Sequence, residues 1–118
     1  MQSPHKGSNP FRAARIAWAG LLAAARHELA FRLELAACLI LVPAAFWVGN
    51  TAVERSLLLG SLLLVLIVEL GNSALETALD RVSLEQHALT GRAKDIGAAA
   101  VLLSLVNAAV IWLLLAID

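Results

Sequence analysis

The chain has 118 residues, of which 60% are hydrophobic and 15% are charged, with no formal net charge and a mean hydropathy of +0.80. A soluble domain is about 45–50% apolar and about 25% charged, and so small a globule could not bury this much apolar surface. The composition therefore excludes an ordinary soluble domain and indicates one membrane domain spanning residues 1–118. The single cysteine, Cys38, excludes a fold that rests on an internal disulfide.

The first element that the sequence predicts is a helix over residues 8–27, lying in the plane of the membrane interface. Phe11 and Trp18 fall on one side at helical spacing, and Arg12 and Arg15 gather on an adjoining arc. An apolar face beside a basic face is typical of an interfacial helix, and tryptophan is enriched at the depth of the lipid headgroups.

Three transmembrane helices follow, predicted over residues 29–48, 53–80 and 91–117. A helix needs about 20 residues to cross a hydrocarbon core of about 30 Å. Pro43 lies inside the first of these helices, and Gly49-Asn50-Thr51 is a turn signal before the second. The chain is thus expected to be an all-α membrane protein.

Positive charge predicts the orientation of these helices. Eight of the nine lysines and arginines precede the first span or lie between the second and third, and only Arg55 lies between the first and second. Positive residues concentrate on the cytoplasmic side. We therefore expect a cytoplasmic N-terminus, a cytoplasmic connection over residues 81–91 and a C-terminus outside the cytoplasm.

The second span carries an unusual set of polar residues, which align on one stripe of its cytoplasmic half at helical spacing: Glu69, Asn72, Ser73, Glu76 and Asp80. An acidic residue at mid-helix costs about 3 kcal/mol on insertion scales and normally faces a functional site in the interior. The alternative is a hydrogen-bond network that only joins helices. Two carboxylates one heptad apart favour the functional interpretation.

Further carboxylates, Glu28 and Glu34, flank the entry of the first span. Glu28 can join Glu76 near the cytoplasmic boundary if their helices pack together. Such a cluster suits Mg²⁺, which takes one or two protein carboxylates and completes its shell with water and phosphate oxygens. Each of these two residues is otherwise an ordinary interfacial charge, and the sequence leaves that alternative open.

The start of the third span has features of an anion site. Thr90 is predicted to be the N-cap of this helix, where free N–H groups and the helix dipole favour an anion. Lys94 adds a mobile positive charge suited to phosphate, and Asp95 complements the dipole. His87 is expected in the preceding loop.

Carboxylates, a metal-compatible cluster and a phosphate-compatible helix start together indicate phosphoryl transfer, which needs charge neutralisation and a group that accepts a proton. The sequence contains no G-x-x-x-x-G-K-[ST] loop and no glycine-rich loop of the soluble kinases. A kinase of this sequence must therefore use another architecture.

Three stretches carry a specific resemblance. They read E-L-A-F-R-L-E at 28–34, V-E-L-G-N-S-A-L-E at 68–76 followed by Asp80-Arg81, and G-R-A-K-D-I-G-A-A-A-V at 91–101. On these motifs the chain resembles the prokaryotic integral-membrane diacylglycerol kinase family from about Trp18 to its end. A sister branch that phosphorylates undecaprenol shares the acidic and Lys-Asp motifs, and the forms found here are more similar to the diacylglycerol branch.

The resemblance implies a homotrimer in the bacterial inner membrane that uses ATP and Mg²⁺ to convert 1,2-diacylglycerol to phosphatidic acid, without any nucleic-acid partner. It implies that Glu69 is the general base, that Glu28 and Glu76 bind the metal, and that Asn72, Lys94 and Asp95 are polar active-site residues. The residues that it implies for binding ATP are Glu28, Glu76, Glu85, His87, Lys94 and Asp95. Those that it implies for the lipid substrate are Trp18, Phe31, Arg32, Glu34, Arg55 and Glu69.

The chain departs from the family pattern at Asn9, Ile16 and Leu22, where a basic, an aromatic and a basic residue are expected respectively. These departures leave the nucleotide contacts open. An alternative from another class is a subunit of a proton-coupled transporter, for which an intramembrane glutamate is typical. That alternative explains Glu69 but not Lys94 and Asp95.

Overall fold

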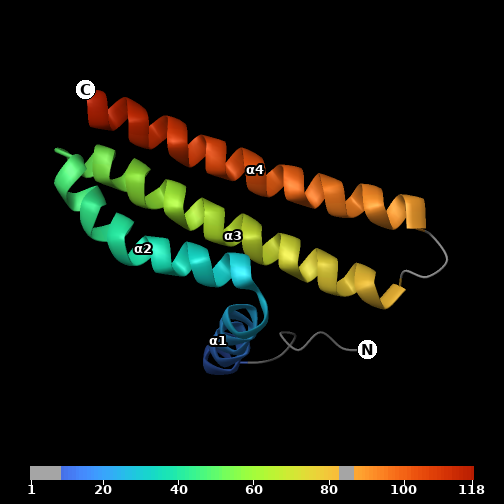
Figure 1. The fold of residues 1–118 in the computed structure, drawn as a ribbon. Coiled ribbons are helices and arrows are strands. Elements are labelled where there is room, and N and C mark those ends of the chain that lie inside the picture. The colour runs from blue at the N-terminus through green and yellow to red at the C-terminus, as the bar shows by residue number, and fades with distance from the viewer. Residues whose placement is uncertain (1–8, 83–86) are drawn as a thin grey trace.

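The computed structural model describes residues 9–82 and 87–118, which form four helices. These are α1 (Pro10–His27), α2 (Leu29–Val48), α3 (Ala52–Val82) and α4 (His87–Ile117). The last three are long and apolar enough to cross a membrane. Figure 1 shows α3 between α2 and α4, with α1 set apart and crossing the direction of the bundle. The all-helical architecture with three candidate spans confirms the predicted fold class.

Hydrogen bonds cap both ends of α1, and those at its second end fix the junction with α2. Asn9 is the N-cap, and its Oδ1 accepts a hydrogen bond of 2.8 Å from the Arg12 backbone N–H. At the other end, Glu28 is extended and interrupts the helix. Arg32 reaches back from α2, and its Nη1 donates to the carbonyl oxygens of Ala25 and Arg26, both at 2.9 Å. These bonds satisfy carbonyl groups that the end of a helix leaves free.

The predicted turn between the first two spans is confirmed, since α2 ends at Val48 and α3 begins at Ala52. Thr51 Oγ1 accepts from the Glu54 N–H at 3.1 Å, and Glu54 Oε1 accepts from the Asn50 N–H at 3.0 Å. The two side chains thereby cap the start of α3 in the manner of a capping box.

The start of α4 differs from the prediction. The helix begins at His87, so Thr90 lies inside its first turns and is not the N-cap. Only the first four N–H groups of a helix are free, so Lys94 and Asp95 do not stand at an open helix start. The predicted N-cap position is therefore wrong, because Ala88 and Leu89 are strong helix formers and the helix already begins before Thr90.

The interior of the single chain is small. Its buried apolar side chains lie on α2 and α3 and are Phe31, Ala45, Leu58, Leu62 and Val65. In α4 only 6% of the most apolar window is buried, against 33% in α3. The outward faces of the spans are therefore apolar, as expected of helices whose solvent is lipid or another membrane helix.

Candidate active site

The polar stripe of α3 faces the inside of the molecule. Glu69 is only 5% exposed and Ser73 only 7%, while Asn72 and Glu76 are half-buried. A carboxylate and a hydroxyl in the buried part of a membrane-spanning helix are costly unless they bind something. The sequence prediction that the stripe faces the interior is confirmed for these four residues, whereas Asp80, its last member, is exposed.

Glu69 meets a second carboxyl group from the neighbouring helix. Glu34 on α2 lies next to the Glu69 carboxyl group. Glu34 Oε1 is buried and has no hydrogen-bond partner among the described residues. The structure therefore brings two of the predicted site residues together, one from α2 and one from α3.

One turn further along α3, Asn72 connects α4 to Glu76. The Asn72 Nδ2 donates a hydrogen bond of 3.1 Å to Glu76 Oε1. The Asn72 Oδ1 points toward α4 at Gly97, is buried, and has no hydrogen-bond partner among the described residues. The amide thus orients the Glu76 carboxylate, which was predicted to bind the metal.

Lys94 of α4 forms an ion pair with α3. Its Nζ lies 2.6 Å from Asp80 Oδ1, and both side chains are partly open to solvent. Asp80 was predicted as a member of the stripe, but its partner could not be read from the sequence. Asp95, the next residue, is exposed. The pair places the amine of Lys94 one turn along α3 from Glu76.

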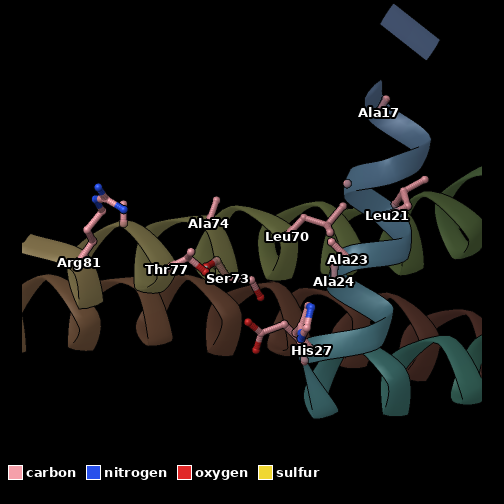
Figure 2. Close-up of a pocket in the computed structure, with 13 residues that line it drawn as sticks. Ala17, Leu21, Ala23, Ala24, His27, Leu70, Ser73, Ala74, Thr77 and Arg81 are labelled. Atoms are coloured by element: carbon pink, nitrogen blue, oxygen red, sulfur yellow. The ribbon is translucent and has the colours of Figure 1, made fainter. Parts of the chain in front are cut away.

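An open groove of about 970 Å³ runs between α1 and the same part of α3. Figure 2 shows its walls, with alanines and leucines of both helices facing each other and Arg81 further along α3. Ser73 lines this groove, and its buried Oγ has no hydrogen-bond partner in the described part of the chain. An apolar groove with a few polar groups at its wall is the usual form of a small-molecule site.

Glu28 lines the groove from the α1 side, next to His27. Glu76 does not line it, and its Oε1 accepts instead from Asn72 within α3. The groove of one chain therefore contains one of the two predicted metal ligands, Glu28, without the other.

Several predicted site residues lie elsewhere. Trp18 is exposed on α1, and Phe31 is 2% exposed and packs in the interior. Arg32 caps α1. Arg55 donates from its Nε to the Gly49 carbonyl oxygen at 3.1 Å, at the opposite end of α3 and about 20 Å along the helix from Glu69. The structure therefore does not bring Arg55 to the other residues.

The predictions for two further residues lie outside what the structure describes. Glu85 lies outside the described residues, and His87 is the first residue of α4 with a side chain that is not described. Their proposed contact with a nucleotide stays a prediction.

Carboxylate oxygens suit a hard divalent cation, which needs several such ligands. Among residues 9–82 and 87–118, no group of three or more His, Cys, Asp or Glu side chains is placed to hold a metal ion. The half-buried Glu76 carboxylate, held by Asn72, fits a cation that brings water and phosphate oxygens as its other ligands. The residues thus suit a metal ion that binds together with a nucleotide, and they suit a permanently bound metal ion less well.

The sequence did not reveal the groove residues His27, Thr77 and Arg81, or the role of Gly97 opposite Asn72. The four-residue spacing of Ser73, Thr77 and Arg81 was a usable signal, because it places them on one face of α3. The contact at Gly97 depends on how closely α3 and α4 approach, which no local pattern encodes.

Comparison with known proteins places this arrangement in a family. The model of the family described as prokaryotic diacylglycerol kinase matches residues 15–116. The chain is 47% identical to the diacylglycerol kinase of Escherichia coli K12 over 104 residues, which cover 88% of this chain and 85% of the relative. It is 44% identical to the diacylglycerol kinase of Pseudomonas aeruginosa over 114 residues, 93% of each chain. The corresponding enzyme of Haemophilus influenzae is 45% identical over 93 residues, 79% of each chain. The chain belongs to the prokaryotic diacylglycerol kinase family.

Proposed function

We propose that this chain is a lipid kinase that transfers the γ-phosphoryl group of ATP to the free hydroxyl of 1,2-diacylglycerol and forms phosphatidic acid. The observation that carries the proposal is the buried Glu69 carboxylate. It lies beside Leu70 and one turn before Ser73, which both line the apolar groove. A carboxylate at membrane depth next to a groove for an apolar molecule suits deprotonation of a lipid hydroxyl.

The proposed reaction uses this chain's residues as follows. Glu69 accepts the proton of the lipid hydroxyl. The hydroxyl oxygen of the lipid then bonds to the γ-phosphorus of ATP, and the bond between that phosphorus and the bridging oxygen of ADP breaks. Lys94 offsets negative charge on the phosphate oxygens. Asn72 holds Glu76 in place through their 3.1 Å hydrogen bond. Asp95, Glu85 and His87 are proposed to face the nucleotide.

Mg²⁺ is the proposed cofactor, held by Glu76 and Glu28. When bound with ATP it supplies positive charge to the phosphate oxygens and helps to align the transferred group. In one chain Glu28 lines the groove and Glu76 does not. They can serve one nucleotide if they bind separate ions or if a neighbouring protomer contributes to the site.

The proposed assembly is a homotrimer in the bacterial inner membrane, with a cytoplasmic N-terminus and a periplasmic C-terminus. Two features support it. The apolar outward faces of α2 and α4 need lipid or further helices as neighbours. Eight of nine lysines and arginines also fall on the side of the α1 helix and the α3–α4 connection.

The test is a transfer assay in mixed micelles with γ-³²P-labelled ATP and equal amounts of diacylglycerol and undecaprenol. We expect label in phosphatidic acid, and loss of the signal when Mg²⁺ is chelated. Label mainly in undecaprenyl phosphate would assign the chain to the sister activity. Absence of label from both lipids, with folded protein, would overturn the kinase proposal.

A further inference from the structure

At Gly97 of α4, a side chain of α3 packs closely against the helix. Gly97 is buried, and a Cβ atom built there would overlap Asn72 Oδ1 and lie 3.1 Å from Leu75 Cδ2 and 3.3 Å from Asn72 Cγ. By contrast, a Cβ atom at Gly60 or Gly71 would meet nothing within 4 Å. The absence of a side chain at Gly97 therefore leaves space for Asn72. The glycines at positions 60 and 71 do not leave space for a neighbour in this way.

The amide of Asn72 is held between two neighbours. Its Oδ1 is buried against Gly97, and its Nδ2 donates to Glu76 Oε1 at 3.1 Å. Rotation of the amide by half a turn would place the carbonyl oxygen against the Glu76 carboxylate, and two acceptors repel each other. The Glu76 carboxylate thus selects which end of the amide it meets, and the room left by Gly97 lets the other end lie against α4.

We propose that Gly97 is a positioning residue. By leaving room for the Asn72 amide, it keeps Glu76 in the orientation that receives the metal–nucleotide complex. The inference rests on the proposed function. An added methyl group would overlap the end of the Asn72 side chain, which moves more easily than the helix backbones. Asn72 would therefore be displaced while α3 and α4 stay packed, and the Glu76 carboxylate would lose its hydrogen bond.

The experiment measures binding of Mn²⁺, as a paramagnetic substitute for Mg²⁺, in the presence of a non-hydrolysable ATP analogue. For Gly97→Ala we expect Mn²⁺ affinity to fall about tenfold, the lower end for loss of a group that orients a metal ligand. Gly71→Ala and Gly60→Ala are the matched controls, since the same methyl group enters open space at both positions. They should keep the wild-type affinity. Unchanged Mn²⁺ binding in a folded Gly97→Ala protein would overturn the inference.

A double-mutant cycle keeps the test decisive if Gly97→Ala alone folds poorly. Asn72→Ala removes the atoms that the new methyl group would overlap. If Gly97 acts through Asn72, the double variant should bind Mn²⁺ as Asn72→Ala does. A further loss of about tenfold in the double variant would mean that Gly97 acts independently of Asn72. Absence of lipid phosphorylation by the wild-type protein would instead count against the proposed function, and the Mn²⁺ result would still decide the role of Gly97.

Discussion

The two halves of the helical bundle treat buried polar groups differently. We define the site half as residues 29–38, 69–82 and 87–97, and the turn half as residues 39–68 and 98–118. In the turn half, Ser61 donates to the Leu58 carbonyl oxygen at 2.7 Å and accepts from Trp112 Nε1 at 3.1 Å. Ser104 likewise donates to the Val101 carbonyl oxygen at 2.6 Å.

In the site half, polar atoms are buried without partners. Among the described residues, the buried side-chain atoms that lack a hydrogen bond are Glu34 Oε1, Asn72 Oδ1 and Ser73 Oγ, and all belong to this half. Folded proteins satisfy most buried polar atoms, so each exception needs an explanation. The turn half satisfies the hydroxyl groups of Ser61 and Ser104 with hydrogen bonds, whereas the site half leaves these three atoms without a partner among the described residues.

Apart from substitution of the proposed base Glu69, the largest loss of kinase activity is expected for the proposed metal ligand Glu76. Glu76→Gln should lower turnover by more than about a hundredfold and shift the magnesium dependence, because an amide is a poorer ligand than a carboxylate. Magnesium titration of the lipid kinase rate measures both effects. Glu28→Gln is the companion variant, and an unchanged magnesium titration would make Glu28 an ordinary interfacial charge.

A somewhat smaller loss is expected at Lys94. Lys94→Ala should reduce kcat/KM for ATP by on the order of a hundredfold, because a positive charge near the phosphate oxygens is removed. The exposed ion pair with Asp80 contributes little to stability, so the protein should stay folded.

Asp80→Asn is the matched control, because it breaks the same ion pair and keeps the lysine charge. Steady-state kinetics with ATP varied should show a much smaller loss for this variant than for Lys94→Ala. Equal losses would mean that the ion pair matters, and that the lysine does not act on ATP.

Matched serines sharpen the comparison between the halves. Ser73→Ala should lower kcat/KM for diacylglycerol by roughly tenfold, the equivalent of one hydrogen bond to a ligand. It should not lower the unfolding temperature, since the Ser73 Oγ has no partner within the described chain. Ser61→Ala should leave kcat/KM for diacylglycerol unchanged and should lower the unfolding temperature, because Ser61 Oγ has two hydrogen-bond partners. Equal behaviour of the two variants in kinetics and thermal unfolding would remove the distinction.

The smallest effect is expected in the turn half. Trp112→Phe keeps an aromatic side chain but replaces the indole with a smaller phenyl ring, and it loses the hydrogen bond to Ser61. Such bonds within membranes are worth about 0.6 kcal/mol on average, so unfolding should become slightly easier. The kinase rate should stay within about twofold of wild type, a difference of less than 0.5 kcal/mol. A large loss of activity would show that the turn half takes part in function.

Much of this fold is readable in the sequence, because apolar runs and turn residues act locally. Gly49-Asn50-Thr51 marked the first turn correctly, and the spacing from Glu69 to Glu76 placed the stripe on one face of α3. Thr90 was misjudged as an N-cap because residues with a capping preference also occur inside helices, where neighbours such as Ala88 favour continuation.

The side-chain contacts between helices could not be predicted from the sequence pattern. The pairing of Lys94 with Asp80 and the fit of Asn72 against Gly97 depend on the rotation of α3 and α4 about their axes. Phe31 and Arg32 belong to a recognisable motif, yet one packs in the interior and the other caps α1. A motif identifies the family, but geometry decides which of its residues face a ligand.

Catalysis by Glu69 is tested most directly by comparing two glutamates, one from each half. Glu69 is buried in the site half, and Glu54 accepts a hydrogen bond from the Asn50 N–H at the turn. Glu69→Gln and Glu54→Gln keep the size of each side chain and remove its charge. The account predicts that Glu69→Gln still folds and binds MgATP but phosphorylates diacylglycerol at least about a hundredfold more slowly, whereas Glu54→Gln retains a near-normal rate. A near-normal rate for a folded Glu69→Gln protein would contradict the account.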